Sequence, residues 1–517
     1  ATQATPHRPA TSVASPGTNL LLNPGAEAGD ATATGYDAVT IPGWQVALGL
    51  PTVVHYGDLG FPGPLTPGAP ERGSNFFAGG AGGTASLVQD IPIRFPASPP
   101  KTVTYRVSAW LGGQGAQTDN ASVTLTFRNA TGAAISAAHI GPVTAKDRHD
   151  VTEFLQRVGT GVIPPGTRAV EVALVLATNS TDYDGATSMI GYNRGFADDL
   201  SFSLSAAVQK PPPLAPPVAN IPHFQHVFIV VMENEDFQSI IGNTWQAPYV
   251  NSLVPQASVL ANMYAEVHPS DPNYLALSGG STFGVLGNPI EYNLKLTINA
   301  KNLGDLIESA HETWKAYEQS ANGPCDLGIH GFFYLDDIPF VYYKDIRDSV
   351  ARCRAHIVTL TQLIGNPSDP SRPYDLQKAS TTPNLVWIAP DDCYDGESCG
   401  IPASDGFLAA TLPDIFRSPA WTTQRSMLII TWDEDGYDLE RPAQRIPTLI
   451  LGSSNVRQAY ASVTRYTHYS LLRTIEAALG LPALRKNDLY ATPLNDIFYF
   501  FLPPAGAGPL RSPQLVR

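Results

Sequence analysis

Four apolar runs in the second half of this 517-residue chain each lead into residues that can do chemistry. Three of them end in acidic clusters, namely HVFIVVMENED (226–236), LVWIAPDD (385–392) and MLIITWDEDG (427–436). The fourth run, Ala257–Ala265, is followed by HPSDPNY, in which two prolines stop the run and hold Ser270 in a turn. Ser-Asp-Pro is also ordinary turn chemistry. A serine hydroxyl that is held in a turn close to such acidic clusters can nevertheless act as a nucleophile.

These side chains need elements that bring them together. Runs of five or six apolar residues bounded by polar ones predict strands buried on both faces, as in a parallel sheet. Ligands of open α/β sheets collect beyond the carboxyl ends of the strands. That many carboxylates require a compensating cation, and a cation also activates a hydroxyl. The first hypothesis is therefore metal-assisted ester cleavage by the residues that converge there: Glu233, Asn234, Ser270, Asp391, Asp392, Asp433, Glu434 and Asp435.

The chain also carries several longer motifs in order: MENEDFQSIIG, APYVNSLVPQASVLANMYAEVHPSDPNYLALSGGSTFGV, NLGDLIESAHETWKAYEQS, TWDEDG and THYSLLRTIEAALGLP. Together they resemble the phosphoesterase family of acid phosphatases and phospholipases C, over Phe224 to about Pro503. That family belongs to the alkaline phosphatase superfamily. The resemblance implies an α/β sandwich domain and a metal-bound serine or threonine that is transiently phosphorylated.

The resemblance assigns roles residue by residue. It makes Ser270 the nucleophile, which also binds the metal, and it makes Glu233 and Asn234 the first metal-binding pair. The late metal-binding pair is then Asp433 and Glu434. Two further catalytic roles are implied: Asn273, in the same turn as Ser270, would support phosphoryl oxygens, and His468 would contact metal or phosphate. A histidine in the first turn of a helix, as His468 is expected to be, can instead simply pack or cap.

Three positions depart from the family pattern, because Glu235, Asp337 and Glu397 stand where relatives commonly have histidine. Ionised carboxylates repel phosphate, so we expect a second or harder cation, or a changed substrate. The metal is calcium, magnesium, manganese or zinc. The candidates for a second metal or for substrate binding are Asp391, Asp392, Asp395, Glu397, Asp337 and Lys315. Lys315 is flanked by aromatic residues and is equally typical of a surface lysine that extends along apolar neighbours.

All four cysteines lie in the second half of the chain. Four cysteines allow three pairings. We expect Cys325 to pair with Cys353 and Cys393 with Cys399, because each bond closes a local loop and no histidine cluster indicates a zinc site. Disulfides of this kind favour an extracellular setting.

The region 17–206 contains short alternating runs separated by Gly, Asn, Asp and Pro, which predict an antiparallel β-sandwich. Its first and last strands resemble those of galactose-binding-like and carbohydrate-binding jelly rolls. That likeness implies a structural calcium held by Glu27, Asp198 and Asp199, although the two aspartates fit a simple turn equally well. Aromatic side chains there would stack on sugars of a polysaccharide or cell-surface glycan. The sandwich fits a rigid spacer as well.

We therefore expect a multidomain chain: a flexible N-terminus (1–16), a β-sandwich (17–206), a Pro-rich linker (207–222) and a catalytic domain (223–517). The net charge is −14, of which −11 falls on residues 211–517. That balance argues against nucleic acid as a partner. The sequence shows no transmembrane segment, and its Pro- and Gly-rich, Lys-poor composition favours a secreted enzyme.

The leading hypothesis is a secreted, metal-dependent phosphoester hydrolase of acid phosphatase or phospholipase C type that acts through a phosphoserine intermediate. The motifs do not separate monoester from diester substrates. Two alternatives stay open. One is a catalytically degenerate protein that binds glycans or cell surfaces, and the other is a hydrolase of a related ester such as a sulfate or phosphonate.

Overall fold

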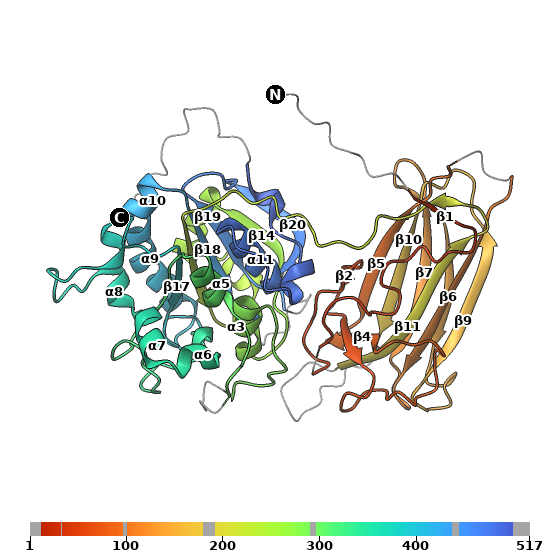
Figure 1. Cartoon of the computed structure of the whole chain (residues 1–517), viewed down its shortest axis with the longest axis horizontal. Helices are drawn as coiled ribbons and strands as arrows, with labels where there is room; N and C mark the ends of the chain where they lie inside the picture. Colours follow the sequence, from red (N-terminus) through yellow and green to blue (C-terminus); the bar gives the residue numbers. More distant parts are fainter. Residues whose placement is uncertain are drawn as a thin grey trace. The chain divides into compact units, whose positions relative to one another are not determined.

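The structure is a computed structural model of the whole chain, and it describes residues 12–32, 34–96, 101–178, 192–289, 296–436 and 444–499. The chain divides into two compact units, Ala1–Ala215 and Pro216–Arg517. In Figure 1 the first unit is drawn almost entirely as strands, whereas the second has strands among helices. The two units are described separately below.

The first unit contains two five-stranded antiparallel sheets that share one core. One sheet has the order β2 (Gln45–Leu48), β5 (Ala85–Pro92), β10 (Ala169–Ala177), β7 (Asn120–Arg128), β8 (Ala134–Val143). The other has the order β3 (Thr52–His55), β4 (Asn75–Ala81), β11 (Tyr192–Leu204), β6 (Thr104–Gly113), β9 (Glu153–Val162). Strands such as β7 and β10 alternate buried and half-buried residues, as a strand with one face in a core must. Two packed sheets were predicted from this alternation.

The ends of this unit differ from the prediction. A short strand β1 (Val13–Ala14) pairs antiparallel with β12 (Val208–Gln209). Residues 13–14 had been placed in a flexible N-terminus and residues 208–209 in the linker. Ala14 and Val208 are buried in the core of the unit, and that burial explains why both segments are ordered. Sugar stacking was expected from aromatic residues of this unit such as Trp44, Tyr56, Phe76, Phe77 and Trp110. Of these, Trp44, Phe76 and Phe77 are buried and unavailable to sugars.

The second unit is built on one mixed eight-stranded sheet. Its order is β16 (Ile357–Thr359), β15 (Trp314–Glu318), β17 (Leu385–Ala389), β13 (His226–Met232), β18 (Ser426–Trp432), β19 (Thr448–Gly452), β14 (Ser258–Tyr264), β20 (Tyr460–Thr467). The central strands β13, β17 and β18 are buried at every residue, because helices cover both faces of the sheet. Only β19 runs antiparallel to its neighbours, a departure from the fully parallel sheet that the apolar runs suggested.

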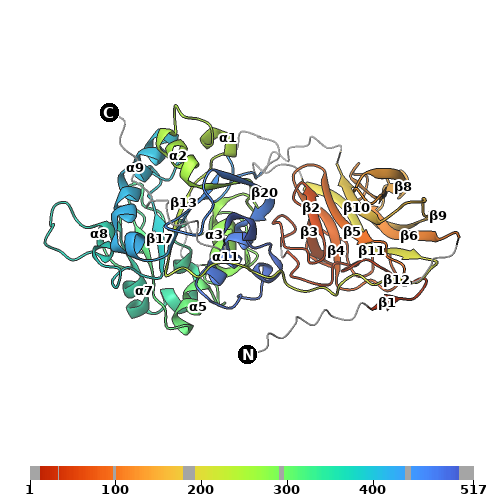
Figure 2. The ribbon, with the colours of Figure 1, turned by 90° about the horizontal axis from the view of Figure 1, so that it is seen from above.

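Two aromatic contacts define the two faces of this sheet. Phe228 on β13 contacts Trp421, with ring centroids 6.4 Å apart, whereas Trp387 on β17 contacts Phe340 at 5.4 Å. Phe228 pairs with Val386, the residue before Trp387, so the two rings point to opposite faces. One layer therefore holds α2 (Pro248–Leu253), α9 (Ile401–Arg417) and α10 (Pro419–Thr423), and the other holds α3 (Ser270–Gly279), α11 (His468–Ala478) and the 3₁₀-helix η2 (Pro339–Tyr342) (Figure 2).

The remaining helices in the described ranges are short. They are α1 (Phe237–Ile240), α5 (Leu303–Ser309), α6 (Lys344–Arg347), α7 (Val350–His356), α8 (Leu360–Ile364) and the 3₁₀-helices η1 (Val254–Gln256), η3 (Asp375–Gln377), η4 (Asn487–Tyr490) and η5 (Asn495–Ile497). None of the helices in the described ranges has the length and apolar character needed to cross a membrane.

Candidate active site

The carboxyl ends of four strands meet at one edge of the second unit's sheet, as the apolar runs predicted. Val227 on β13 pairs in parallel with Leu385 on β17 on one side and with Met427 on β18 on the other. Strand β14 is antiparallel to β19, which is antiparallel to β18, so β14 also points the same way. The residues that follow these strands therefore lie at a common edge, where open α/β sheets bind ligands.

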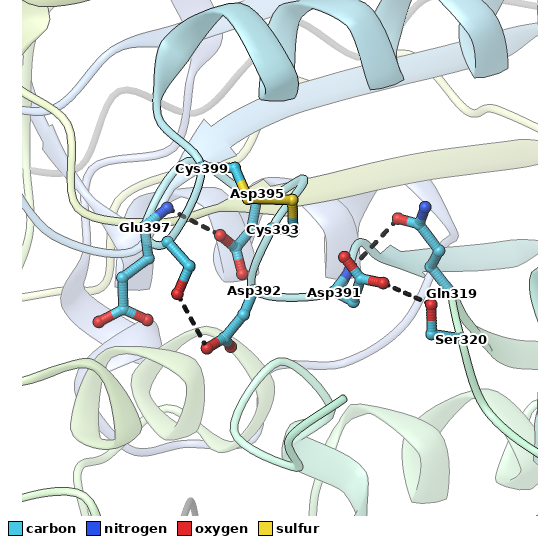
Figure 3. The surroundings of a disulfide bond; sticks show 9 residues. Gln319, Ser320, Asp391, Asp392, Cys393, Asp395, Glu397 and Cys399 are labelled. Atoms are coloured by element: carbon cyan, nitrogen blue, oxygen red, sulfur yellow. Dashed lines mark hydrogen bonds between the residues drawn. A yellow bond between two sulfur atoms is a disulfide. The ribbon is translucent and has the colours of Figure 1, made fainter. Parts of the chain in front are cut away.

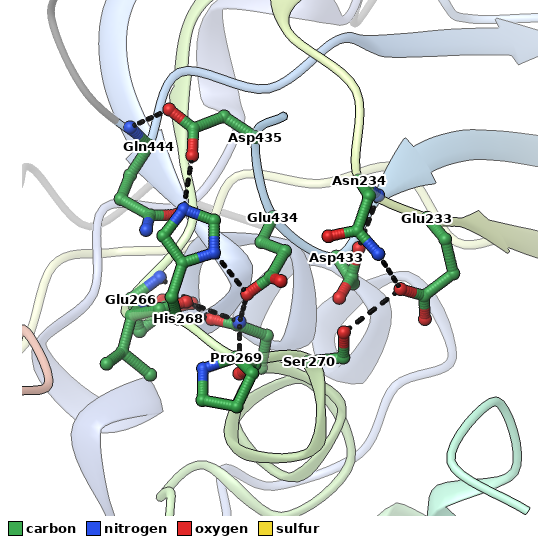
Figure 4. Close-up of polar contacts among 12 residues, drawn as sticks. Glu233, Asn234, Glu266, His268, Pro269, Ser270, Asp433, Glu434, Asp435 and Gln444 are labelled. Atoms are coloured by element: carbon green, nitrogen blue, oxygen red, sulfur yellow. Dashed lines mark hydrogen bonds and ion pairs between the residues drawn. The ribbon is translucent and has the colours of Figure 1, made fainter. Parts of the chain in front are cut away.

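Ser270 lies within hydrogen-bonding distance of Glu233, the first residue after β13 (Figure 4). Its hydroxyl donates to Glu233 Oε2 at 3.0 Å, and the Asn234 side chain donates to the same oxygen at 3.0 Å. The backbone N–H of Asn234 donates to Asp433 Oδ1 at 3.1 Å, which ties the end of β13 to the end of β18. Asn234 adopts a left-handed conformation (φ 53°), which its short polar side chain tolerates. Four predicted residues thus form one group.

Ser270 is the first residue of helix α3, all ten residues of which are buried. The N-terminus of a helix attracts negative charge, so this position suits a serine that attacks an anionic group. Asn273 shapes the preceding turn: its Oδ1 accepts from the backbone of Glu266 and Val267, and its Nδ2 donates to the Val267 carbonyl at 2.7 Å. Both ends of the Asn273 amide are therefore hydrogen-bonded to the backbone. Asn273 positions the serine turn, and its predicted contact with phosphoryl oxygens is not supported.

His268 joins the two acidic residues that follow Asp433. Its Nδ1 lies 2.8 Å from Glu434 Oε2 and its Nε2 lies 2.6 Å from Asp435 Oδ1 (Figure 4). Burial disfavours a charged imidazole, but Glu434 and Asp435 outweigh that effect and raise the pKa of His268 to about 10. His268 is therefore a cation that fixes Glu434 beside the serine turn. It was missed in the sequence, although it stands two residues before Ser270.

Tyr274 is a second residue that the sequence analysis missed. Its hydroxyl lies 2.6 Å from Glu233 Oε1 and 2.7 Å from Asp337 Oδ1. Tyr274 and Ser270 are four residues apart on α3, so both side chains lie on the helix face that meets Glu233. The i, i+4 spacing of Ser270 and Tyr274 in HPSDPNY is the sequence signal that could have identified Tyr274 as a site residue.

The donor set around Ser270 fits a divalent cation. Asn234 Oδ1, Asp433 Oδ2 and Glu434 Oε1 are buried oxygens with no hydrogen-bond partner in the described part of the chain. Burial, together with Asp433 and Asp337, raises the pKa of Glu233 well above its ordinary value. Orphaned buried oxygens are costly unless a cation or a proton occupies the space between them. Glu233, Asn234, Ser270, Asp433 and Glu434 would hold such a cation, which would lower the pKa of a bound hydroxyl.

A second acidic group combines two residues of the loop after β17, Asp392 and Asp395 (Figure 3), with Asp337, which precedes η2. Each of the three places a carboxylate oxygen within 4.8 Å of the others. The disulfide Cys393–Cys399 closes this loop, and Cys325–Cys353 is also formed, so both predicted pairings are confirmed. The Glu233 backbone N–H donates to the carbonyl of Asp395 at 3.1 Å, which anchors the loop to the first group.

Two of the predicted residues, Asp391 and Lys315, lie apart from both groups. Asp391 faces away from the loop and accepts from Ser320 (Figure 3). Glu397 stands in the loop beside the second group: its backbone N–H donates to Asp395 Oδ1 at 2.8 Å, and burial together with Asp392 and Asp433 raises its pKa to about 7. Lys315 forms an ion pair with Asp375 at 2.7 Å. Lys315 was a candidate for substrate binding, and the structure does not support that role because Asp375 already neutralises its charge.

His468 is buried at the start of α11 and is not available to a metal or a phosphate. Its Nδ1 lies 2.6 Å from Glu266 Oε2, and its Nε2 lies 2.9 Å from the carbonyl oxygen of Trp432. Both ring nitrogens are therefore engaged, which corrects the predicted catalytic role. Because Trp432 precedes Asp433 and Glu266 precedes the serine turn, His468 holds the two parts of the site together.

Replacing His468 with leucine is expected to destabilise the protein by about 3–5 kcal/mol, because it leaves the Glu266 carboxylate buried without its partner. Urea unfolding of the full chain would measure this loss. The double variant His468→Leu, Glu266→Leu removes both polar groups and is expected to recover most of the stability. A single variant as stable as the parent would show that the pair contributes nothing.

Two of the three carboxylates proposed for calcium in the first unit, those of Glu27 and Asp198, accept hydrogen bonds from other residues. Glu27 Oε1 accepts from the Asn75 backbone at 2.9 Å, and Asp198 accepts from the Tyr56 hydroxyl and the Asp199 backbone, each at 2.7 Å. Within the described ranges, the second acidic group is the one cluster of three metal-ligating side chains. A structural calcium at Glu27, Asp198 and Asp199 stays a prediction.

The buried carboxylates predict how the stability of cation-free protein depends on pH. Burial raises the pKa of Asp392 to about 6 and raises the pKa values of Asp337 and Asp395 well above the ordinary value. Above pH 4 the folded state then binds more protons than the unfolded state, so stability falls as pH rises. In chelator we expect the melting temperature to be about 5 °C lower at pH 8 than at pH 5.5.

Thermal melting with and without added Mn²⁺ tests this expectation. Asp337→Asn removes one of the titrating groups and is expected to reduce the pH dependence. Added cation is expected to stabilise more at pH 8 than at pH 5.5, because protons compete with it for the carboxylates. A cation-free melting temperature that rises between these pH values would contradict the argument.

Known proteins resemble the second unit most clearly. Residues 243–482 match the family model described as the phosphoesterase family. A phosphatidylinositol-3-phosphatase of Mycobacterium tuberculosis is 30% identical over 286 residues, which cover 54% of this chain and 84% of that protein. The chain belongs to the phosphoesterase family. An acid phosphatase of Aspergillus fumigatus is 27% identical over 345 residues, covering 64% of this chain and 68% of that protein.

The family relation makes this chain a phosphoester hydrolase, as the motifs around Ser270 implied. Among solved structures, a protein of the alkaline phosphatase superfamily from Vibrio parahaemolyticus is 13% identical with a TM-score of 0.39. That match covers 54% of this chain and 72% of that one.

Proposed function

We propose that this phosphoesterase is a secreted, cation-dependent phosphatase that cleaves phosphate monoesters through a phosphorylated Ser270. The observation that carries the proposal is the Ser270 hydroxyl, at a helix N-terminus, bonded to Glu233 among buried oxygens without partners. The monoester preference is supported by the relatives, since an acid phosphatase and a phosphatidylinositol-3-phosphatase both bear names of monoester hydrolases.

In the first half-reaction the Ser270 oxygen attacks phosphorus and the bond from phosphorus to the alcohol oxygen breaks. Ser270 gives up its proton in this step, and Glu233 Oε2, 3.0 Å away, is placed to accept it. The leaving alcohol takes up a proton from water. A divalent cation at this site would supply positive charge to the phosphoryl oxygens and favour the ionised serine.

In the second half-reaction water attacks the phosphoserine and releases inorganic phosphate. The bond between Ser270 and phosphorus breaks as the water oxygen bonds to phosphorus, and the serine oxygen regains the proton that Glu233 had accepted. The N-terminus of α3 directs a favourable helix dipole at the phosphoryl oxygens in both steps. Asn273 and His268 keep the serine turn and Glu434 in place during this cycle.

Secretion is supported by the two disulfides and by the scarcity of lysine noted in the sequence. We propose that the first unit binds polysaccharide or cell-surface glycan and so directs the enzyme to its substrate. Tyr56 and Trp110 are half-buried aromatic residues of this unit, and they are our candidates for stacking on a sugar ring.

Turnover of matched esters tests the function. Phosphate monoesters, phosphodiesters and sulfate esters of one alcohol would be assayed after chelation, with calcium, magnesium, manganese or zinc added singly. The proposal requires the monoester to be cleaved fastest and only with a cation. Faster cleavage of the diester or sulfate would replace the substrate assignment, and equal activity in chelator would refute the cation requirement.

A further inference from the structure

Large apolar side chains are exposed on three loops that border the Ser270 site. They are Leu286, Phe332 and Tyr394, which are 53%, 48% and 40% exposed. Single exposed apolar residues are common on protein surfaces and by themselves indicate nothing. These three are informative because backbone and side-chain hydrogen bonds tie their loops to the residues that surround the serine.

Leu286 lies in the segment 281–289, which follows helix α3 and returns to its N-terminus. The side-chain oxygen of Asn288 accepts from the backbone N–H of Asp271 at 3.1 Å, and Asp271 is the residue after Ser270. Val285 is buried in the core and anchors the segment. Leu286 is therefore held near the serine turn while its own side chain stays exposed.

Phe332 lies at the tip of a tight turn that meets the second acidic group. His330 and Phe333 exchange backbone hydrogen bonds of 3.2 and 2.9 Å across this turn, and Phe333 is buried in the core. The carbonyl of Phe332 accepts from the Asp392 N–H at 3.0 Å. The turn therefore places Phe332 beside the loop that contains Asp392 and Asp395.

Tyr394 stands in that loop. The disulfide Cys393–Cys399 closes the loop and limits the positions that Tyr394 can take. The loop also contacts the end of β13, because the Glu233 N–H donates to the carbonyl of Asp395 at 3.1 Å. Glu233 is the residue that accepts from the Ser270 hydroxyl. Tyr394 is thus fixed one loop away from the reacting serine.

We propose that Leu286, Phe332 and Tyr394 contact the leaving alcohol, and that the enzyme prefers phosphate monoesters whose alcohol is an uncharged alkyl or aromatic group. This preference rests on the proposed function, since it concerns the ester that Ser270 cleaves. Covering an apolar group stabilises the bound state in proportion to the area removed from water. The carboxylates of the second acidic group would repel an alcohol that carries further negative charge.

Straight-chain alkyl phosphates from ethyl to hexyl phosphate test this preference, because they share one leaving-group chemistry and differ in apolar area. With Mn²⁺ present, kcat/KM of the parent is expected to rise by about twofold for each added methylene, or about tenfold over the series. That is less than for a fully buried methylene, because the three side chains are partly exposed. A carboxylate at the end of the chain is expected to abolish the gain.

Alanine variants identify the side chains responsible. Leu286→Ala, Phe332→Ala and Tyr394→Ala are each expected to lower kcat/KM for hexyl phosphate by about threefold or more, and to leave that for ethyl phosphate within twofold. Ethyl phosphate thereby controls for damage to the fold or to the serine. Val463→Ala is the matched control, because Val463 is 75% exposed on the edge strand β20, and it is expected to leave both rates unchanged.

Equal kcat/KM values of the parent for ethyl and hexyl phosphate would overturn the inference and leave the phosphatase function standing. So would alanine variants that all keep the full preference of the parent for hexyl phosphate. If the parent cleaves no ester, the function falls, and calorimetry with ethylphosphonate and hexylphosphonate then decides the inference without turnover. About tenfold tighter binding of hexylphosphonate, reduced in Phe332→Ala, would support the apolar contact, whereas equal affinities would refute it.

Discussion

Replacing Ser270 with alanine is expected to lower kcat for phosphoester cleavage by about 10⁴-fold or more, because the oxygen that attacks phosphorus is lost. Substrate binding is expected to change little, since the helix N-terminus and the acidic residues remain. Initial rates on the best monoester would measure the effect. Rapid acid quench of the parent during turnover is expected to give a phosphorylated peptide containing Ser270.

Ser278→Ala is the matched control for that substitution. Ser278 is also buried on α3, but its hydroxyl pairs with the Tyr343 hydroxyl at 2.9 Å, away from the carboxylates. Its loss is expected to cost about 1 kcal/mol of stability and to leave kcat within twofold. A Ser270→Ala enzyme that retains a tenth of the parent's kcat would rule out Ser270 as the nucleophile.

Neutralising Glu233 or Asp433 is expected to have the next largest effect. Glu233→Gln and Asp433→Asn each remove one anionic donor beside Ser270, so both are expected to lower kcat/KM by about 10³-fold, or several kcal/mol of barrier. Chelation of the parent is expected to produce a similar loss that added cation reverses. Rates measured across a cation titration would show weaker cation binding in both variants.

Glu318→Gln is the control for charge at a strand end. Glu318 is the last residue of β15 and is also a buried carboxylate at the carboxyl edge of the sheet. In the described part of the chain, its side chain forms no hydrogen bond with the residues around Ser270. Its substitution is expected to leave activity unchanged. If Glu318→Gln were as inactive as Glu233→Gln, the loss would reflect the general charge of this edge.

Much of the site was predictable because its signals are local in the sequence. Each of the strands β13, β17 and β18 is a continuous apolar run that ends in acidic residues. Parallel pairing of such runs must bring their carboxyl ends to one edge. The group of Ser270, Glu233, Asn234 and Asp433 follows from that rule and from the family motifs. The two disulfides each close a local loop, which favoured these pairings among the three that four cysteines allow.

The partners of polar side chains could not be predicted in the same way, because they come from residues distant in the sequence. His468 is 202 residues from Glu266, and only packing of α11 beside the serine turn brings them together. The same holds for Lys315 with Asp375 and for Asp198 with Tyr56. A titratable residue looks the same in the sequence whether it contacts substrate or pairs internally.

The sequence by itself determined the strands, the serine turn, the two acidic pairs, the disulfide loops and membership of the phosphoesterase family. Only the tertiary structure decided that His468 and Asn273 are structural, that His268 holds Glu434, and that Tyr274 joins Glu233 to Asp337. The physical reason is that apolar periodicity specifies which face of an element is buried. Pairing between buried polar groups depends instead on the register and packing of elements that are distant in the sequence.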